Sequence, residues 1–134
     1  MLYSPRTTTD VFLVDVAIGE IVHAWRTPFG TGHGAYLSPI GDLLRMEDDS
    51  MRGGYAQNAS LFIPGDASMI SVYDWGGRTL FRKVVNNATH RIHHQFDVHD
   101  FDVRSGTGTL FALCAYKLEC AVAAALGRGM RACC

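Results

Sequence analysis

Short runs of β-branched and aromatic residues, joined in pairs by turns that contain glycine, fill most of this chain. The first pair is Val11–Asp15 and Glu20–Trp25, with Gly19 in the connection. The next pair lies between residues 34 and 46, around a turn at Ser38–Gly41. Such pairs are typical of β-hairpins. The sequence therefore predicts a mainly β fold built from antiparallel sheets.

The same pattern restarts about 60 residues further along the chain, with Asp74 in the place of Asp15 and Gly77 in the place of Gly19. Each unit then continues with a histidine, an aromatic residue and a glycine-led strand: His33, Tyr36 and Gly41–Leu44, then His93, Phe96 and Gly108–Phe111. We therefore predict two four-stranded units, 10–50 and 66–116. Their pattern indicates two blades of a β-propeller or a smaller stacked-sheet repeat.

The end of the chain has a different pattern. Residues 117–127 have high helix propensity, with Leu118, Val122 and Leu126 one turn apart and Gly127 placed to end a helix. Residues 129–134 are expected to form a frayed tail. These features predict one partial β-propeller domain over residues 1–128 that ends in a short helix.

Composition limits the classes of partner. The chain has 134 residues, 48% hydrophobic and 19% charged, which suffices for the core of one domain. The formal net charge of -1 offers no electrostatic surplus for nucleic acid. No apolar run approaches the roughly 18 residues of a membrane span, and the first residues lack the pattern of a secretory signal. We therefore expect no nucleic-acid partner and no membrane span, and the compartment stays unknown.

The cysteines do not follow the spacing of a structural site. Cys114, Cys120, Cys133 and Cys134 all lie in the last fifth of the chain, without a CxxC motif. They are expected to be incidental thiols and not a disulfide framework or a zinc site.

The histidines, in contrast, are clustered. Four of the six lie between His90 and His99, together with Arg91. Imidazole titrates near neutrality, so such a cluster can move protons, bind a metal or attack an electrophile. We therefore place the candidate chemical centre in this segment.

Several short motifs add a family resemblance. They are Leu2–Pro5, Val11–Asp15, Gly19–Trp25, Ala35–Leu37, Gly41–Arg45, Tyr73–Gly77, the pair His93–His94, Ala115–Lys117 and Leu126–Arg128. In this order and spacing, over about residues 2–128, the chain resembles the arylsulfotransferase (aryl-sulfate sulfotransferase) family.

The resemblance implies a six-bladed β-propeller that transfers a sulfuryl group from an aryl sulfate to a phenolic acceptor, without a cofactor. It implies a sulfohistidine intermediate, with other His and Arg side chains holding the sulfate oxygens. His93 and His94 are then the candidate catalytic residues, and Arg91 and His33 the candidate substrate-binding residues. Family members are often periplasmic or secreted.

This chain departs from the family pattern. It has two blade-like units where the family has about six, and Gln95 stands where an acidic residue usually follows the histidine pair. We therefore expect a fragment or incomplete copy with little activity alone.

Strand geometry constrains the candidate residues further. Along a regular strand, Arg91 and His93 would share a polar side, while His94 would share an apolar side with Ile92 and Phe96. Arg91 and His93 are then the predicted oxyanion-facing pair, and His94 is expected to pack between sheets. A β-bulge would reverse or merge these assignments.

Other residues are assigned by their neighbours in the sequence. His33 lies between Gly32 and Gly34, where the backbone can approach a ligand closely. His23 and the aromatic residues of the repeated strands are expected to serve packing: Trp25, Tyr36, Trp75 and Phe96.

Two alternatives to sulfuryl transfer stay open. The first is a metal site. One segment contains the ligand types of a zinc site or of a two-histidine, one-carboxylate iron site: His90, His93, His94, Asp97, His99 and Asp100. No standard motif spacing supports such a site. The second alternative is a non-catalytic structural or interaction module. In that case exposed sheet edges would favour self-association or packing against a partner.

Overall fold

The computed structural model describes residues 1–5, 8–49, 66–85, 90–102, 104–105, 107–116 and 118–127. Strands make up 64% of the described residues, their pairs are antiparallel, and none of the three sheets is closed. The predicted mainly β fold of antiparallel sheets is therefore confirmed.

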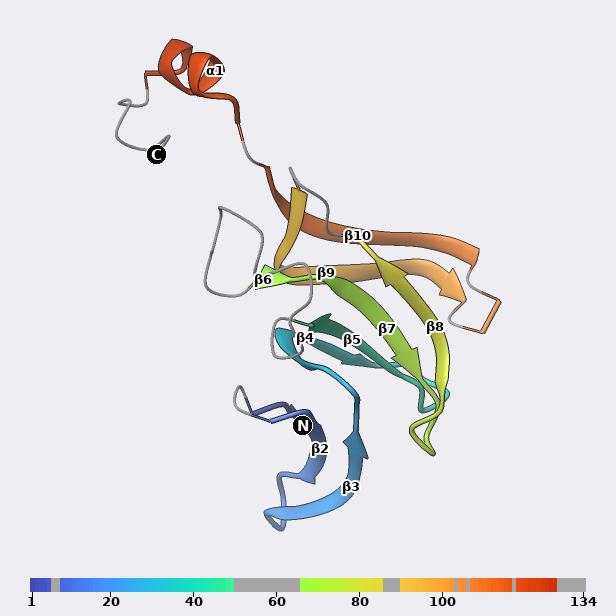
Figure 1. Cartoon of the computed structure of the whole chain (residues 1–134). Helices are drawn as coiled ribbons and strands as arrows, with labels where there is room; N and C mark the ends of the chain where they lie inside the picture. Colours follow the sequence, from blue (N-terminus) through green and yellow to red (C-terminus); the bar gives the residue numbers. More distant parts are fainter. Residues whose placement is uncertain are drawn as a thin grey trace.

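The strands form three sheets (Figure 1). The N-terminal sheet has the order β1–β2–β3, with bounds Leu2–Tyr3, Asp10–Asp15 and Glu20–Arg26. The central sheet has the order β4–β5–β7–β8, with bounds Gly30–Leu37, Leu43–Asp48, Met69–Tyr73 and Thr79–Val84. The C-terminal sheet has the order β10–β9–β6, with bounds Thr107–Tyr116, His90–Asp102 and Asp66–Ala67.

The central sheet lies between the other two sheets, and both of its faces are covered (Figure 1). On one face, Leu43 and Tyr73 pack against Val11 and Trp25 of the N-terminal sheet. The other face carries Leu44, Met46, Ile70 and Val72, which pack against Ile92, Phe96 and Val98 of the C-terminal sheet. Because β5 and β7 alternate apolar side chains toward two cores, both strands are buried along most of their length.

The repeat predicted from the sequence appears again in the strand registers. In the hairpin β2–β3, Leu13 pairs with His23 and the next residue, Val14, pairs with Ile21. In the hairpin β7–β8, Val72 pairs with Phe81 and Tyr73 pairs with Thr79. Each hairpin therefore has one extra residue in its second strand at the same place, beside a turn with a glycine in the left-handed region, Gly19 or Gly77.

The hairpins β4–β5 and β9–β10 also match. Thr31 pairs with Glu47 and Ala35 with Arg45, so four steps along β4 correspond to two steps along β5. Likewise Ile92 pairs with Cys114 and Phe96 with Ala112, so four steps along β9 correspond to two steps along β10. The two hairpins therefore carry β-bulges of the same size at equivalent positions.

The sheets do not coincide with the predicted units 10–50 and 66–116. Each unit is divided between two sheets, because β5 of the first unit pairs with β7 of the second. Leu43–Glu47 and Met69–Tyr73 are buried throughout, so each strand needs a hydrogen-bonding neighbour on both edges. Pairing the two strands with each other satisfies both.

The C-terminal helix is shorter than predicted. In the described part of the chain the helix α1 covers Cys120–Ala125, and Glu119 at its N-cap makes no side-chain capping bond. Gly127 follows it with a φ of 77°, in agreement with the predicted stop. The predicted tail at residues 129–134 lies outside the described residues. No helix among the described residues has the length and apolar character required to cross a bilayer.

The matched hairpins provide a test of the layer order with two leucines. Leu44 and Leu113 lie on equivalent strands and point away from the N-terminal sheet, but Leu44 is 0% exposed and Leu113 is 59% exposed. We expect Leu44→Ala to lower the free energy of unfolding by about 3 kcal/mol, and Leu113→Ala by less than about 1 kcal/mol. Urea unfolding of dilute protein, followed by tryptophan fluorescence, measures both values. Equal losses of stability in the two variants would contradict this layer order, in which Leu44 is buried beneath the C-terminal sheet and Leu113 is exposed on the outer face of that sheet.

Candidate functional site

The candidate histidine pair lies in the β-bulge of β9. Three residues of β9 lie opposite the single residue Leu113 of β10: His93, His94 and Gln95. The residues that flank these three, Ile92 and Phe96, pair with the two neighbours of Leu113. His94 adopts a φ of 61°, in the left-handed region that non-glycine residues rarely occupy. The bulge therefore interrupts the alternation of side chains along β9.

This interruption corrects the predicted faces. The rings of His93 and His94 were expected to point in opposite directions, but their centroids lie 4.0 Å apart in an edge-to-face contact. His94 was expected to pack between sheets, yet it is exposed, whereas His93 is partly buried and its Nε2 atom has no hydrogen-bond partner. Arg91, expected on a polar side, is only 4% exposed and lies next to Ile92 of the core.

His33 lies at the equivalent place in β4. Gly32, His33 and Gly34 oppose the single residue Met46, between the pairs formed by Thr31 and Ala35. By register His33 therefore corresponds to His94, one residue beyond His93, which the sequence pattern had aligned with it. The side chain of His33 lies outside the described part of the structure.

The two glycines beside His33 lie against other strands of the protein, and not against an open space that a ligand could fill. A Cβ atom at Gly32 would lie 2.4 Å from the Cβ of Ala67, and one at Gly34 would lie 2.9 Å from the ring of Phe96. On this side of β4 the glycines therefore face protein atoms, and the substrate-binding role of His33 stays a prediction. Their role is to let β6 and β9 come close to β4.

The remaining histidines have other neighbours. His99 forms an exposed ion pair with Asp100, with 3.2 Å between His99 Nε2 and Asp100 Oδ2. The His90 ring contacts Tyr116 edge-to-face at 4.6 Å between centroids. His23 packs between Trp25 and Trp75, and its Nε2 lies 2.9 Å from the carbonyl oxygen of Trp75. His23 thus serves packing, as expected.

The aromatic residues divide into two groups. Trp25 is buried and Phe96 is partly buried in the core, in agreement with the prediction. Tyr36 and Trp75 are exposed, although Trp75 stacks on His23 and lies over Gly41.

The described residues do not form a metal centre. Among them, no three or more His, Cys, Asp or Glu side chains come close enough to hold an ion. Cys114 is an exposed free thiol. The side chain of Cys120, and all of Cys133 and Cys134, lie outside the described residues.

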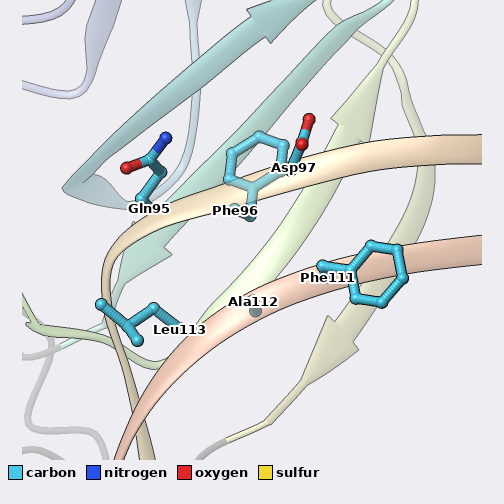
Figure 2. A pocket seen from close by; sticks show the side chains of 6 residues that line it. All are labelled: Gln95, Phe96, Asp97, Phe111, Ala112 and Leu113. Carbon is cyan, nitrogen blue, oxygen red and sulfur yellow. The ribbon is translucent and has the colours of Figure 1, made fainter.

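A shallow hollow of about 390 Å³ opens on the outer face of the C-terminal sheet, beyond the bulge (Figure 2). It is lined by Gln95, Phe96, Asp97, Phe111, Ala112 and Leu113. Its walls are mainly apolar, and the carboxylate of Asp97 disfavours an anion. The hollow is therefore a poor oxyanion site and a better contact surface for an apolar neighbour.

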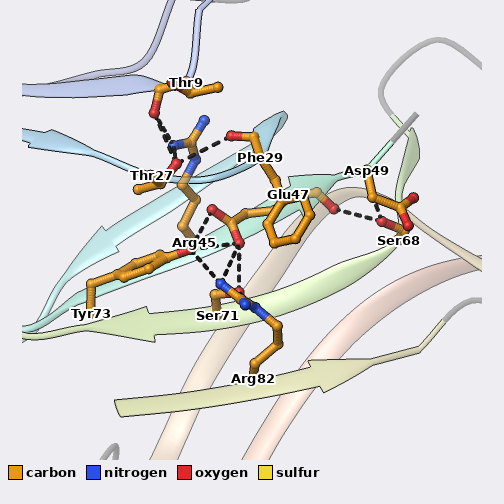
Figure 3. Close-up of polar contacts among 10 residues, drawn as sticks. All are labelled: Thr9, Thr27, Phe29, Arg45, Glu47, Asp49, Ser68, Ser71, Tyr73 and Arg82. Atoms are coloured by element: carbon orange, nitrogen blue, oxygen red, sulfur yellow. Dashed lines mark hydrogen bonds and ion pairs between the residues drawn. The ribbon is translucent and has the colours of Figure 1, made fainter. Parts of the chain in front are cut away.

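Sequence analysis missed a buried polar cluster in the central sheet, which Figure 3 shows. The carboxylate of Glu47 is fully buried and accepts hydrogen bonds from the hydroxyls of Ser71 (2.6 Å) and Tyr73 (2.7 and 2.8 Å). Arg82 donates to Ser71 Oγ at 3.0 Å and to Tyr73 Oη at 2.9 Å, and one of its nitrogens lies 3.7 Å from Glu47. The negative charge is therefore balanced inside the protein.

Arg45 is the second buried charge on the same face of β5. Its Nη1 atom donates to the Thr9 carbonyl oxygen at 2.8 Å and to the Thr27 hydroxyl, which ties β5 to the N-terminal sheet (Figure 3). Its Nε and Nη2 atoms are buried without hydrogen-bond partners. Burial lowers the pKa of Arg45 from its usual value, and the charge of Glu47 opposes this effect.

One sequence signal pointed to this cluster. Arg45 and Glu47 alternate with Leu44 and Met46, a pattern that normally indicates a strand with one solvent-facing side. The polar hydroxyls of Ser71 and Tyr73 follow the same alternation in β7, which pairs with β5. Only the pairing of these two strands reveals that both polar sets meet in the interior.

Comparison of the whole chain with known protein families, with curated proteins and with solved structures finds no match. The geometry of the site therefore has to be interpreted from its own residues.

The buried cluster predicts a dependence of stability on alkaline pH. Burial, followed by the charge of Glu47, raises the pKa of Tyr73 to about 12, compared with about 10 in an unfolded chain. A raised pKa contributes stability that is fully present below about pH 10 and is lost as the pH rises through about 12. We expect this contribution to be at most roughly 2–3 kcal/mol.

Tyr73→Phe isolates this contribution. The variant should be less stable than the wild type near pH 9, and the difference should shrink as the pH approaches about 12. Urea unfolding at a series of pH values measures it. A difference that is constant over this range would show that folding does not raise the pKa of Tyr73.

Proposed function

We propose that this chain is an arylsulfotransferase-like protein and that its β-bulges contribute residues to a sulfuryl-transfer site. The observation that carries the proposal is the bulge of β9, which brings the imidazoles of His93 and His94 together and leaves His93 Nε2 without a partner. Arg91 adds a guanidinium two residues before His93. His33 occupies the equivalent bulge in β4.

The arrangement of the sheets supports the family interpretation. The central sheet has four antiparallel strands in chain order and lies between two further sheets, as a blade does in a β-propeller. The hairpin β9–β10 repeats the register of β4–β5, as the first half of a following blade would. Propeller blades are thus part of the proposal, along with its chemistry.

The chemistry uses an imidazole nitrogen as nucleophile. A neutral nitrogen of His93 or His94 attacks the sulfur atom of an aryl sulfate, and an N–S bond forms while the S–O bond to the aryl group breaks. The phenolate leaves with the bonding electron pair. A phenolic acceptor then passes its proton to the departed phenolate, directly or through water, and attacks the sulfohistidine sulfur. A new S–O bond forms while the N–S bond breaks, which restores the imidazole. Arg91 and the second imidazole offset the charge of the sulfate oxygens.

A second candidate is a non-catalytic interaction module. It is favoured by large apolar side chains that stay exposed on the outer sheets, including Ile21 and Val22 on β3 and Phe111 and Leu113 on β10. Exposed patches of large apolar side chains commonly mark a contact with another protein surface. A site built at a propeller axis also requires neighbouring sheets, so the turnover measurement below, and not the exposed apolar surface, distinguishes the two candidates.

The proposal predicts sulfate binding at the bulge. His93→Ala and His94→Ala should each weaken sulfate binding by about tenfold, because each removes a charge-assisted hydrogen bond. Arg91→Ala should weaken it as well, because it removes a guanidinium that offsets the charge of the sulfate oxygens. Calorimetric titration with sodium sulfate near pH 6, at constant ionic strength, measures these changes.

His99→Ala is the matched control, because His99 lies on the same strand outside the bulge and pairs with Asp100. It should leave sulfate affinity unchanged. Equal weakening by all the histidine variants would indicate a general charge effect. Tight zinc binding without sulfate binding, and no effect of Arg91→Ala, would favour the metal alternative and exclude the bulge as an oxyanion site.

Turnover by the isolated chain should be low. A site at a propeller axis takes groups from several blades, and this chain supplies one complete four-stranded sheet in its described part. We expect little or no continuous release of p-nitrophenol from p-nitrophenyl sulfate with phenol as acceptor. Robust turnover would contradict this expectation while establishing the activity itself.

A further inference from the structure

The C-terminal sheet ends in a strand whose edge is open within the described part of the chain. β10 pairs with β9 on one side, and no described strand pairs with it on the other. Its equivalent in the repeat is β5, which pairs with β4 on one side and with β7 on the other. The internal repeat therefore identifies which kind of strand fits the open edge of β10: an equivalent of β7.

The exposed fraction of the side chains gives the same result. Phe111 and Leu113 correspond by register to Leu44 and Met46. Phe111 and Leu113 are each 59% exposed, whereas Leu44 and Met46 are 0% exposed beneath the C-terminal sheet. The hollow between these two side chains, shown in Figure 2, is thus a core position that lacks its covering layer.

The chain carries the required strand at its other end. β2 corresponds to β7, because Leu13 and Val14 occupy the places of Val72 and Tyr73 in the matched hairpins. One edge of β2 corresponds to the edge of β7 that faces β5. Among the described residues, the strand that pairs with this edge of β2 is β1, which has two residues. In a single copy this edge and the edge of β10 lie in different sheets.

We propose that a second copy of this chain pairs its β2 with β10, antiparallel and in the register of β5 with β7. Transferring the observed β5–β7 pairs through the two repeats defines the contacts. They are Leu110 with Val14, Phe111 with Leu13, Ala112 with Phe12, Leu113 with Val11, and Cys114 with Asp10.

The pairing is head to tail. Each copy presents one β10 edge and one β2 edge, so the contact is heterologous and propagates into a ring or an open chain of copies. The central sheet of the incoming copy then covers Phe111 and Leu113, as the C-terminal sheet covers Leu44 and Met46. This inference depends on the repeat alone and is independent of the sulfuryl chemistry.

β1 competes with the incoming strand. Its two residues pair with Phe12 and Leu13, and the N-terminal amine donates to the Val14 carbonyl oxygen at 2.7 Å. The incoming β10 occupies the same edge over five residues of β2 and must displace β1. Weakening β1 should therefore strengthen the association, which an unspecific apolar contact would not show.

Thiol cross-linking tests the register directly. Cys114 is exposed, and the side chain of Asp10, its proposed partner, forms an ion pair with the exposed Arg26. With Cys120, Cys133 and Cys134 replaced by serine, Asp10→Cys should give a ladder of disulfide-linked or bis-maleimide-linked copies on a non-reducing gel. Glu20→Cys in the same background is the matched control, because Glu20 is exposed and lies on β3, which is neither of the two strands proposed to pair. It should give no ladder.

Sedimentation velocity completes the test with one variant on β10 and one on β1. Leu113→Lys, at an exposed site, should shift the wild-type oligomers to monomer, because a charge blocks the apolar contact. Tyr3→Pro, which disturbs β1, should shift the distribution to larger species at equal concentration. Wild-type protein that stays monomeric at about 100 μM, or equal cross-linking of the Asp10→Cys and Glu20→Cys variants, would overturn the proposal.

Discussion

The pairing of β5 with β7 determines the rest of the structure. It joins the second hairpin of one sequence unit to the first hairpin of the next, and it forms the sheet on which both other sheets pack. A strand buried on both faces and paired on both edges has no access to water. Polar groups on β5 must therefore find partners inside the protein. Glu47 finds them in Ser71, Tyr73 and Arg82, all from the strands that this pairing brings together.

The same pairing explains why the candidate site lies where it does. With the central sheet fixed, β9 packs over β4, and Phe96 comes against Gly34 at a distance that leaves no room for a Cβ atom. Both strands carry a bulge at this place. A bulge redirects side chains near a sheet edge without disrupting the pairing beyond it. His94 is thereby turned to the surface while Ile92 and Phe96 remain in the core.

Local patterns in the sequence predicted the hairpins well and the sheets poorly. The turn residues Asp15, Gly19, Asp74 and Gly77 mark both hairpin turns, since their backbone and side-chain requirements are local. The assignment of hairpins to sheets depends on contacts distant in sequence, and no local pattern encodes them.

Local patterns in the sequence did not predict the bulges either. His93 and His94 are adjacent in either geometry, and only the partner strand, with one residue opposite three, reveals the irregularity. The alternation rule therefore placed Ile92 correctly and His94 on the wrong face. The buried state of Arg45 and Glu47 was missed for a related reason, because a charged residue that alternates with leucine is usually at the surface.

The two equivalent hairpins differ in their polar residues, and this difference bears on how copies can associate. In the central sheet, Arg45 lies opposite Ser71, and its burial leaves two nitrogen atoms without partners. By register the corresponding position in β10 is Ala112, and the strand proposed to pair with it offers Phe12. An interface with this pair buries no arginine, so it avoids the cost of removing a guanidinium from water. Contact between copies at this edge would therefore be mainly apolar, and its strength would depend on Phe111, Leu113 and the displacement of β1.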